Sequence, residues 1–197
     1  TFGDFGSFSL HPRKAISSGE GGLITCQKPE LAKKVQILRN HGIDIIDGKM
    51  EFVEAGFNYR MTDFQAALVN SQLARLKETL TYKNELANEY QSLITNSKIQ
   101  VPNCPADRIH TWQTYHVLID PTINRDELIK TLREKGIGTN YGAQNIPDQI
   151  YYKNKYNHNA AIAFPNASRA YKEGLAIPLY EKLNSADISY IAAELNK

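Results

Sequence analysis

The feature that most constrains the fold is the stretch from residue 62 to residue 95, which contains neither glycine nor proline. Thr62 and Asp63 can cap a helix at its start. Its apolar residues fall near helical spacing: Phe64, Leu68, Leu73, Leu76, Leu80, Leu86, Tyr90 and Leu93. We therefore predict a long helix over residues 61–95, of the kind that joins two subdomains. The alternative is two helices with a break near residues 79–81.

The residues before this helix predict a strand–loop–strand unit. Large and small side chains alternate over residues 5–10, as in a strand, and Pro12 cannot continue a ladder. A Gly-rich turn over residues 19–22 precedes a second strand at 23–26. The polar connection between the strands is the first candidate site. A helix from Pro29 to near Asn40 and a long ordered loop over residues 42–60 follow.

The residues after the helix predict a small α/β layer over residues 96–197, because strands alternate with helices there. We expect Tyr115, Val117 and Ile119 to share one buried face of a strand. Asn124 is expected to cap a helix that ends near residue 136. The expected strands are 99–101, 114–119 and 137–141, and two further helices are expected to end near residues 174 and 195.

Composition excludes several classes of protein. The 197 residues are 42% hydrophobic and 22% charged, which is typical of a globular chain. A net charge of +2 without a basic block argues against a nucleic-acid partner, and no apolar run approaches the ~20 residues needed to cross a membrane. Cys26 and Cys104 lie far apart, which favours a reducing, cytoplasmic compartment. The five histidines lack the spacing of metal ligands.

Lys14 is the first residue that could carry chemistry, since it lies in the polar connection beside Arg13. A lysine becomes a nucleophile when desolvation or a neighbouring cation lowers its pKa. Ser9, Ser17 and Ser18 could donate hydrogen bonds to a phosphate. The pattern alone favours a solvated surface lysine, as most lysines are.

Two further polar clusters stand out. Residues 58–60, Asn-Tyr-Arg, directly precede the expected helix and could bind an anion, or could form a capping loop with a salt-bridged Arg60. Residues 140–152 interleave amides with tyrosines such as Tyr141, which suits a polyhydroxylated or nucleotide ligand as well as an interface or a solvated loop. We expect the aromatic side chains of Trp112, Tyr115 and Tyr151 in the core.

Taken in order, these motifs resemble the DegT/DnrJ/EryC1/StrS aminotransferases, pyridoxal-phosphate enzymes that act on nucleotide-linked keto sugars. Residues 8–14 and 19–22 resemble the lysine loop of that family. The other matching segments are residues 56–67, 136–139, 149–152, 164–167 and 174–180. The resemblance implies an α/β PLP-transferase fold (aspartate aminotransferase-like, fold type I), here the end of the large domain plus the C-terminal small domain.

The resemblance also implies a role for individual residues. Lys14 would form the Schiff base with pyridoxal 5'-phosphate (PLP) and move the proton between the cofactor and the substrate carbon. Ser9 would hydrogen-bond the cofactor phosphate. Asn58 would reach the phosphate of the neighbouring subunit's cofactor, since these enzymes build each site across a homodimer. Arg60 and the loop around Tyr141 would face that neighbour's nucleotide sugar.

The activity implied is transfer of an amino group from glutamate to a keto-deoxysugar nucleotide, in surface-polysaccharide or amino-sugar biosynthesis. One alternative is a sugar dehydratase relative that uses pyridoxamine phosphate. That branch replaces the lysine with histidine, so Lys14 argues against it. Another alternative is a non-catalytic fragment that acts as a binding or regulatory domain, against which the intact lysine motif argues.

Two departures from the family pattern limit these expectations. Many relatives carry a histidine followed by an aromatic residue after the Gly-Ile-x-Thr motif, where residues 141–143 here are Tyr-Gly-Ala. The family also places much of the cofactor cradle upstream of the lysine strand, and only thirteen residues precede Lys14. We therefore expect residues 1–60 to be a remnant of the large PLP-binding domain and this chain alone to be inactive. The strand residues expected to lack packing partners are Phe5, Phe8, Leu10, Leu23 and Ile24.

Overall fold

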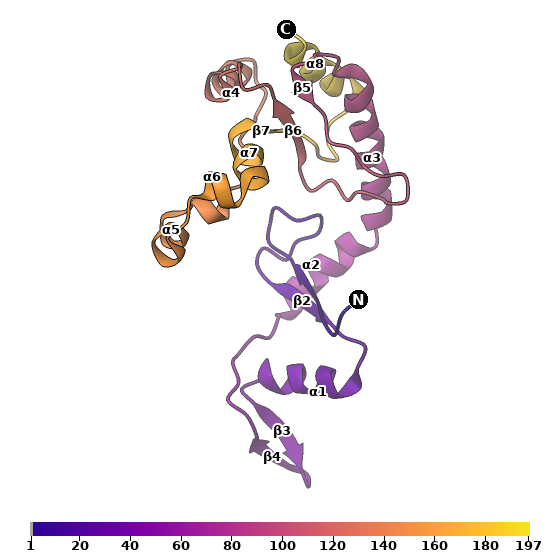
Figure 1. Ribbon diagram of the computed structural model, residues 1–197. Coiled ribbons are helices and arrows are strands. Elements are labelled where there is room, and N and C mark those ends of the chain that lie inside the picture. The colour runs from indigo at the N-terminus through magenta and orange to yellow at the C-terminus, as the bar shows by residue number, and fades with distance from the viewer. Residues whose placement is uncertain (1) are drawn as a thin grey trace. The chain divides into compact units, whose positions relative to one another are not determined.

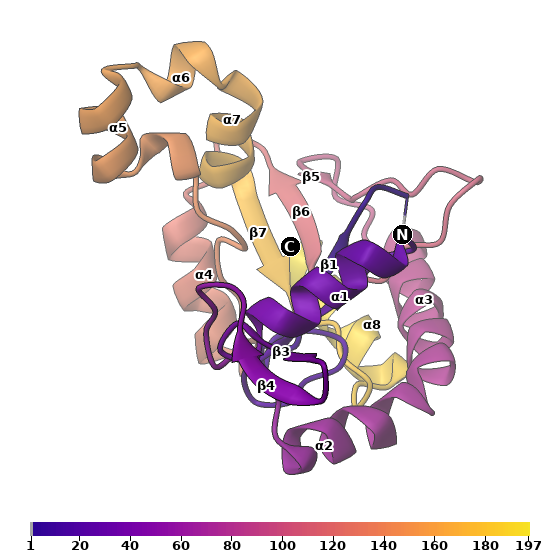
Figure 2. The same ribbon diagram turned by 90° about the horizontal axis from the view of Figure 1, so that it is seen from below.

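The computed structural model describes residues 2–197 and divides into two compact units, one up to Lys77 and one over Glu78–Lys197 (Figures 1 and 2). The first unit contains β1 (Gly6–Ser9), β2 (Gly22–Thr25), α1 (Pro29–Leu38), β3 (Ile43–Ile46), β4 (Lys49–Phe52) and α2 (Asp63–Leu73). The helices of the second unit are α3 (Leu76–Leu93), which begins just before the division, α4 (Arg125–Glu134), α5 (Ile150–Tyr156), α6 (Ala160–Ala163), α7 (Pro165–Glu173) and α8 (Ser185–Leu195). Its strands are β5 (Ile99–Gln100), β6 (Tyr115–Ile119) and β7 (Gly174–Ile177), with a short 3-10 helix at Ile146–Asp148.

The predicted strand–loop–strand unit is confirmed. β1 and β2 pair antiparallel, with Phe8 opposite Leu23. Phe5, Phe8, Leu23 and Ile24 are all exposed, as expected. Leu10 departs from the expectation: it is only 4% exposed, and its backbone is hydrogen-bonded to Ser18 and Gly21 across the β1–β2 connection.

The loop expected over residues 42–60 is in part a β-hairpin, so that prediction was wrong. β3 and β4 pair antiparallel, from Ile43 opposite Phe52 to Ile46 opposite Lys49. Figure 2 shows the two strands side by side. Asp47 and Gly48 form the turn with φ of 50° and 76°, the left-handed pair that a tight hairpin requires. The Asp-Gly dipeptide was the signal that sequence reasoning missed.

The predicted long helix is two helices, α2 and α3, separated by a turn at Ala74 and Arg75. The two-helix alternative is therefore correct, although the break precedes the expected position at residues 79–81. Ala74 keeps helical dihedrals, and the Arg75 N–H donates to the Gln72 carbonyl, three residues back, at 3.0 Å. The interruption is a local tightening of the helix that needs no glycine or proline, so composition could not locate it.

The predicted cap of α2 is confirmed as a capping box. The Thr62 hydroxyl accepts from the Gln65 N–H at 3.3 Å, and the Gln65 side chain accepts from the Thr62 N–H at 3.0 Å. These two bonds satisfy amide groups that a helix start leaves unpaired. They fix where α2 begins, directly after the Asn-Tyr-Arg segment.

The second unit is built on an antiparallel sheet of order β5-β6-β7 (Figure 1). Tyr115, Val117 and Ile119 of β6 are buried on one face, as predicted. Tyr90 of α3 packs against Tyr115 at a ring separation of 5.0 Å and donates its hydroxyl to the Pro178 carbonyl at 2.8 Å. The same core takes in side chains of α3, α4, β7 and α8: Leu86, Leu132, Leu175, Ile188 and Ile191.

Two expectations about the second unit need correction. Residues 137–141 form no strand, and only an isolated bridge joins Asn140 to Ala176. The third strand is β7, whose residues are all buried. Gly136 and Gly142, which flank this segment, have φ of 78° and 79°. Trp112 is buried as expected, whereas Tyr151 on α5 is 63% exposed.

Candidate functional site

Residues 10–21, which connect β1 to β2, form a loop closed by its own hydrogen bonds; we call it the lysine loop. The Leu10 N–H donates to the Gly21 carbonyl at 2.9 Å, and the Ser18 N–H donates to the Leu10 carbonyl at 3.0 Å. The Ser17 hydroxyl donates to the same Leu10 carbonyl and accepts from the Gly19 N–H, each at 3.0 Å. The serines expected to bind phosphate, Ser17 and Ser18, are therefore engaged in shaping the loop.

Helix α2 holds the lysine loop from one side. The Gln72 side chain accepts from the Ser17 N–H at 3.0 Å and donates to the Ser17 carbonyl at 2.7 Å. Gln65 donates to the Glu20 carbonyl at 3.0 Å. Sequence reasoning missed both contacts, because bonds across 45 and 55 residues leave no local signal.

Lys14 lies half-buried in the turn at the tip of this loop. Its N–H donates to the His11 carbonyl at 2.9 Å, and the Arg13 N–H donates to His11 Nδ1 at 3.2 Å. Ser9, the last residue of β1, is exposed, and its hydroxyl accepts from the His11 N–H at 3.3 Å. The structure thus places Ser9 at the end of β1 and Lys14 in the connection that follows, on either side of His11.

The Asn-Tyr-Arg segment is tied to the end of α1. The Tyr59 N–H donates to the Arg39 carbonyl at 2.9 Å, and Asn58 forms an isolated bridge with Asn40. The Arg60 guanidinium donates to the Asn40 side chain at 2.6 Å. Asn58 and Arg60 remain exposed, so both side chains can still reach a ligand.

Two glycines allow this attachment. A Cβ on Gly56 would lie 2.1 Å from the Gly42 nitrogen and 2.7 Å from the Leu38 carbonyl oxygen. Contacts this short do not occur in real structures, so only glycine lets the two backbones approach. The position of Asn58 relative to α1 therefore depends on Gly42 and Gly56.

Tyr141 belongs to the second unit, where it is partly exposed. Gln144 donates to the Tyr141 hydroxyl at 2.7 Å. The Tyr141 ring meets Tyr171 edge-on at 5.6 Å, and the Arg125 guanidinium lies 5.9 Å from the Tyr141 centroid. Because only 15% of the Arg125 side chain is exposed, this cation–π contact is partly desolvated.

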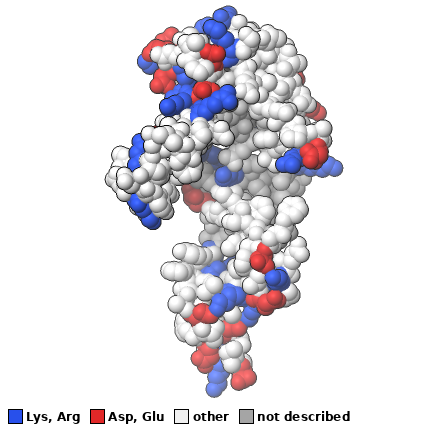
Figure 3. Space-filling view, viewed as in Figure 1, with Lys and Arg blue, Asp and Glu red and all other residues white. Residues whose placement is uncertain are grey.

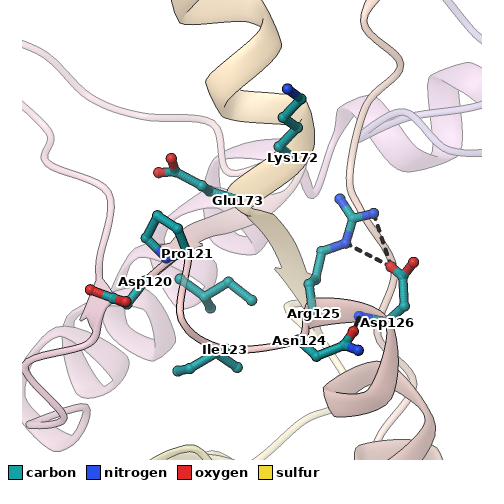
Figure 4. A pocket seen from close by; sticks show the side chains of 9 residues that line it. Asp120, Pro121, Ile123, Asn124, Arg125, Asp126, Lys172 and Glu173 are labelled. Atoms are coloured by element: carbon teal, nitrogen blue, oxygen red, sulfur yellow. Dashed lines mark hydrogen bonds and ion pairs between the residues drawn. The ribbon is translucent and has the colours of Figure 1, made fainter.

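Two shallow pockets of the second unit contain none of the predicted site residues. Figure 4 shows the first, of about 370 Å³, between the start of α4 and the end of α7. There, hydrogen bonds from the Thr122 hydroxyl and N–H hold the pKa of Asp120 below its usual value. The second pocket, of about 440 Å³, is lined by Pro178, Tyr180 and Tyr190 among others.

The distribution of charged residues does not point to a different functional site. Lys and Arg alternate with Asp and Glu at the hairpin end of the first unit and over α4 (Figure 3). Lys33 pairs with Asp44, and Lys130 with Glu127. Residues 2–197 hold no cluster of three or more His, Cys, Asp or Glu side chains that could bind a metal. Within the same residues, no helix combines the length and apolar character needed to cross a membrane.

The model of the DegT/DnrJ/EryC1/StrS aminotransferase family matches residues 1–196. The chain belongs to this family. Aminotransferases of this family depend on PLP, and the fold of the chain is the mixed α/β fold of its solved members. The sequence-based assignment of family, fold and cofactor is thereby confirmed.

Individual relatives support the family assignment. The uncharacterized protein MJ1066 of Methanocaldococcus jannaschii is 30% identical over 210 residues, which cover 100% of this chain and 54% of that protein. Spr1654 of Streptococcus pneumoniae, assigned as a sugar aminotransferase and solved in PMP and PLP forms, is 25% identical in its PMP form. Its TM-score is 0.88, with 100% of this chain and 51% of that chain covered.

PseC of Helicobacter pylori, an aminotransferase in the biosynthesis of pseudoaminic acid, shares the fold with a TM-score of 0.89 at 23% identity. The match covers 98% of this chain and 53% of PseC. The chain therefore spans about half the length of the relatives it matches.

The chemistry of the lysine loop fits PLP. The cofactor carries an aldehyde and a phosphate, which call for a primary amine and for hydrogen-bond donors. Lys14 supplies the amine, and the exposed Ser9 supplies a hydroxyl donor at the end of the strand that leads into the loop.

Proposed function

We propose that the full-length protein is a PLP-dependent aminotransferase that transfers an amino group from glutamate to a keto-deoxysugar nucleotide. One observation carries the proposal: Lys14 lies in a loop that its own hydrogen bonds and α2 hold in place, and Ser9 ends the strand that leads into this loop. Family membership and the sugar aminotransferases among the structural relatives support it. The proposal includes a role in surface-polysaccharide or amino-sugar biosynthesis.

Each site residue has a defined task in this proposal. Bound PLP supplies the electron sink that amino transfer requires. Lys14 Nζ is its covalent anchor and, once released, moves the proton of the reacting carbon. The Ser9 hydroxyl donates to the cofactor phosphate.

The remaining residues act across a homodimer. Asn58 donates to the phosphate of the partner subunit's cofactor. Arg60, which Asn40 already orients at 2.6 Å, pairs with a phosphate of the nucleotide, where a planar guanidinium is effective. Tyr141 packs against the nucleotide sugar.

The proposal also assigns the two ends of the chain. Residues 1–60 belong to the large PLP-binding domain and residues 96–197 form the small domain, with the helices between them as the link. The reaction takes place in the cytoplasm, which the free thiols of Cys26 and Cys104 favour.

The test uses the two half-reactions of the full-length protein. Glutamate should convert the bound cofactor, followed by its absorbance, and a 3-keto or 4-keto deoxysugar linked to UDP, dTDP or GDP should convert it back. Lys14→Ala should slow both half-reactions at least about 100-fold, because proton transfer is lost. The exposed Lys49→Ala on the hairpin is the matched control and should behave as wild type. Unchanged half-reactions in Lys14→Ala, or no turnover of any keto sugar by the wild type, would refute the proposal.

A further inference from the structure

His116 lies in the middle strand of the second unit's sheet, on the face opposite to the core residues Tyr115 and Val117. It stands opposite Ala176 of β7, and Ala176 in turn bridges to Asn140. These two pairings connect β6, through β7, to the start of residues 140–145, which we call the Tyr141 loop. The function proposed above gives His116 no role.

The imidazole of His116 fills the space beside two glycines. A Cβ on Gly142 would lie 2.5 Å from His116 Cδ2 and 2.9 Å from Nε2. A Cβ on Gly174 would lie 2.3 Å from Nε2 and 2.6 Å from Cε1. Since a Cβ essentially never approaches another atom within 3.0 Å, the ring is in direct contact with the backbone of both glycines.

The contact between the His116 ring and the two glycines is steric. His116 Nε2 is buried and has no hydrogen-bond partner within residues 2–197. A buried polar atom without a partner costs free energy, so hydrogen bonding by Nε2 does not explain the placement of the ring. What the ring does provide is a rigid body between β7 and the Tyr141 loop.

Gly142 links the His116 ring to Tyr141, because it touches the ring and directly follows Tyr141 in the chain. The Gly142 N–H donates to the Asn140 side chain at 2.7 Å, and its φ of 79° turns the chain directly after Tyr141. Asn140 and Ala176 exchange backbone hydrogen bonds of 2.7 and 3.3 Å. Because Asn140 is fixed to the sheet, the position of the His116 ring against Gly142 sets the direction in which the Tyr141 loop leaves the sheet.

We propose that His116 is a positioning residue: its ring holds Gly142 and thereby sets the position of Tyr141 toward the nucleotide sugar. The second half of this statement rests on the proposed function, which assigns Tyr141 to the sugar. The loop carries no histidine of its own, and the fold brings one to it from β6.

A double-mutant cycle in the full-length protein tests the contact. The variants are His116→Ala, Gly142→Ala, the double variant, and Gly138→Ala as control, because a Cβ on Gly138 meets nothing within 4 Å. Hydrogen exchange of the Tyr141 loop amides is the first readout. Gly142→Ala should accelerate exchange about tenfold or more, and clearly less when His116 is already alanine, since the clash is then gone. The strain of alanine at positive φ is common to both backgrounds and cancels.

The second readout separates positioning from general destabilisation. His116→Ala should raise KM for the keto-sugar nucleotide that the wild type turns over, on the order of 10- to 100-fold. The glutamate half-reaction and kcat should stay within about twofold. Unchanged exchange of α3 amides checks that each variant is folded, and His116→Asn replaces His116→Ala throughout the cycle if it is not.

The outcomes separate the two proposals. Additive effects in the exchange cycle would overturn the contact. A coupled cycle with an unchanged KM would overturn the link to the sugar. If the wild type turns over no keto sugar, the proposed function fails, while the exchange cycle still decides whether His116 positions the loop.

Discussion

The two units of the chain bury their apolar side chains to very different extents. In the unit after residue 77, a continuous core from Leu86 to Leu195 includes side chains with no exposed surface, such as Tyr115 and Leu175. In the described residues before it, Leu10 alone among the large apolar side chains is buried. Phe8 and Leu23, which face each other on β1 and β2, are each 53% exposed.

Within residues 2–197, different interactions hold the second unit and the lysine loop of the first. The second unit is held by burial of apolar surface, which is non-directional and tolerates modest change. The lysine loop of the first unit is held by directional bonds from Ser17, Ser18, Gln65 and Gln72. The loop proposed to carry the cofactor is therefore sensitive to single polar substitutions that would be harmless on the surface of the other unit.

A pair of leucine substitutions should give the largest contrast between the units. Leu175→Ala, in the core, should lower the free energy of unfolding by about 2–5 kcal/mol, through lost burial and a cavity. Leu23→Ala, on the exposed face, should change it by less than about 0.5 kcal/mol. Denaturant titrations of this chain measure both values. Equal losses would show that the units do not differ in the way their exposures indicate.

Removal of a polar contact should have the next largest effect. Gln72→Ala breaks both bonds to the Ser17 backbone and should cost about 1–3 kcal/mol locally. Hydrogen exchange at residues 17–19 should accelerate about tenfold or more, with the second unit unaffected. The exposed Gln36→Ala on α1 is the control. If exchange at residues 17–19 is unchanged, α2 does not hold the lysine loop.

The smallest effect concerns a charged contact of the second unit. Glu194 binds Lys135 and Lys197, and the hydrogen bond from Lys135 is the main cause that lowers the pKa of Glu194 below its ordinary value of 4.5. A lowered pKa means that the carboxylate stabilises the fold above that value and ceases to do so as the pH falls through its folded pKa.

Glu194→Gln should therefore lower the Tm slightly at pH 7, and the difference from wild type should shrink as the pH falls below about 4.5. Thermal melts at pH 7, 5 and 3 measure this, with the exposed Glu181→Gln as the matched control. A difference that grows toward low pH would contradict the assignment.

Patterns within one element were predictable from the sequence, whereas contacts between distant elements were not. The alternation of Tyr115, Val117 and Ile119 and the cap at Asn124 followed from local rules, and both are present. The assignment of residues 137–141 as a strand failed because Asn140 alone among them pairs with β7.

At the candidate site, an ordered set of short motifs indicated Lys14, Ser9 and Asn58. The sequence could not reveal that Gln72 shapes the loop or that His116 meets Gly142, since each contact joins residues far apart in the chain. The break at Ala74 was missed for a different reason: no residue type marks a local tightening of a helix.

The identity of the lysine that binds the cofactor tests the central claim most directly. The full-length protein, incubated with PLP and reduced with borohydride, is digested, and the modified peptide is located by mass spectrometry, with Lys14→Arg as control. The account predicts one pyridoxyl group per subunit on Lys14 and none in the control. A pyridoxyl group on another lysine, or on none, would contradict it.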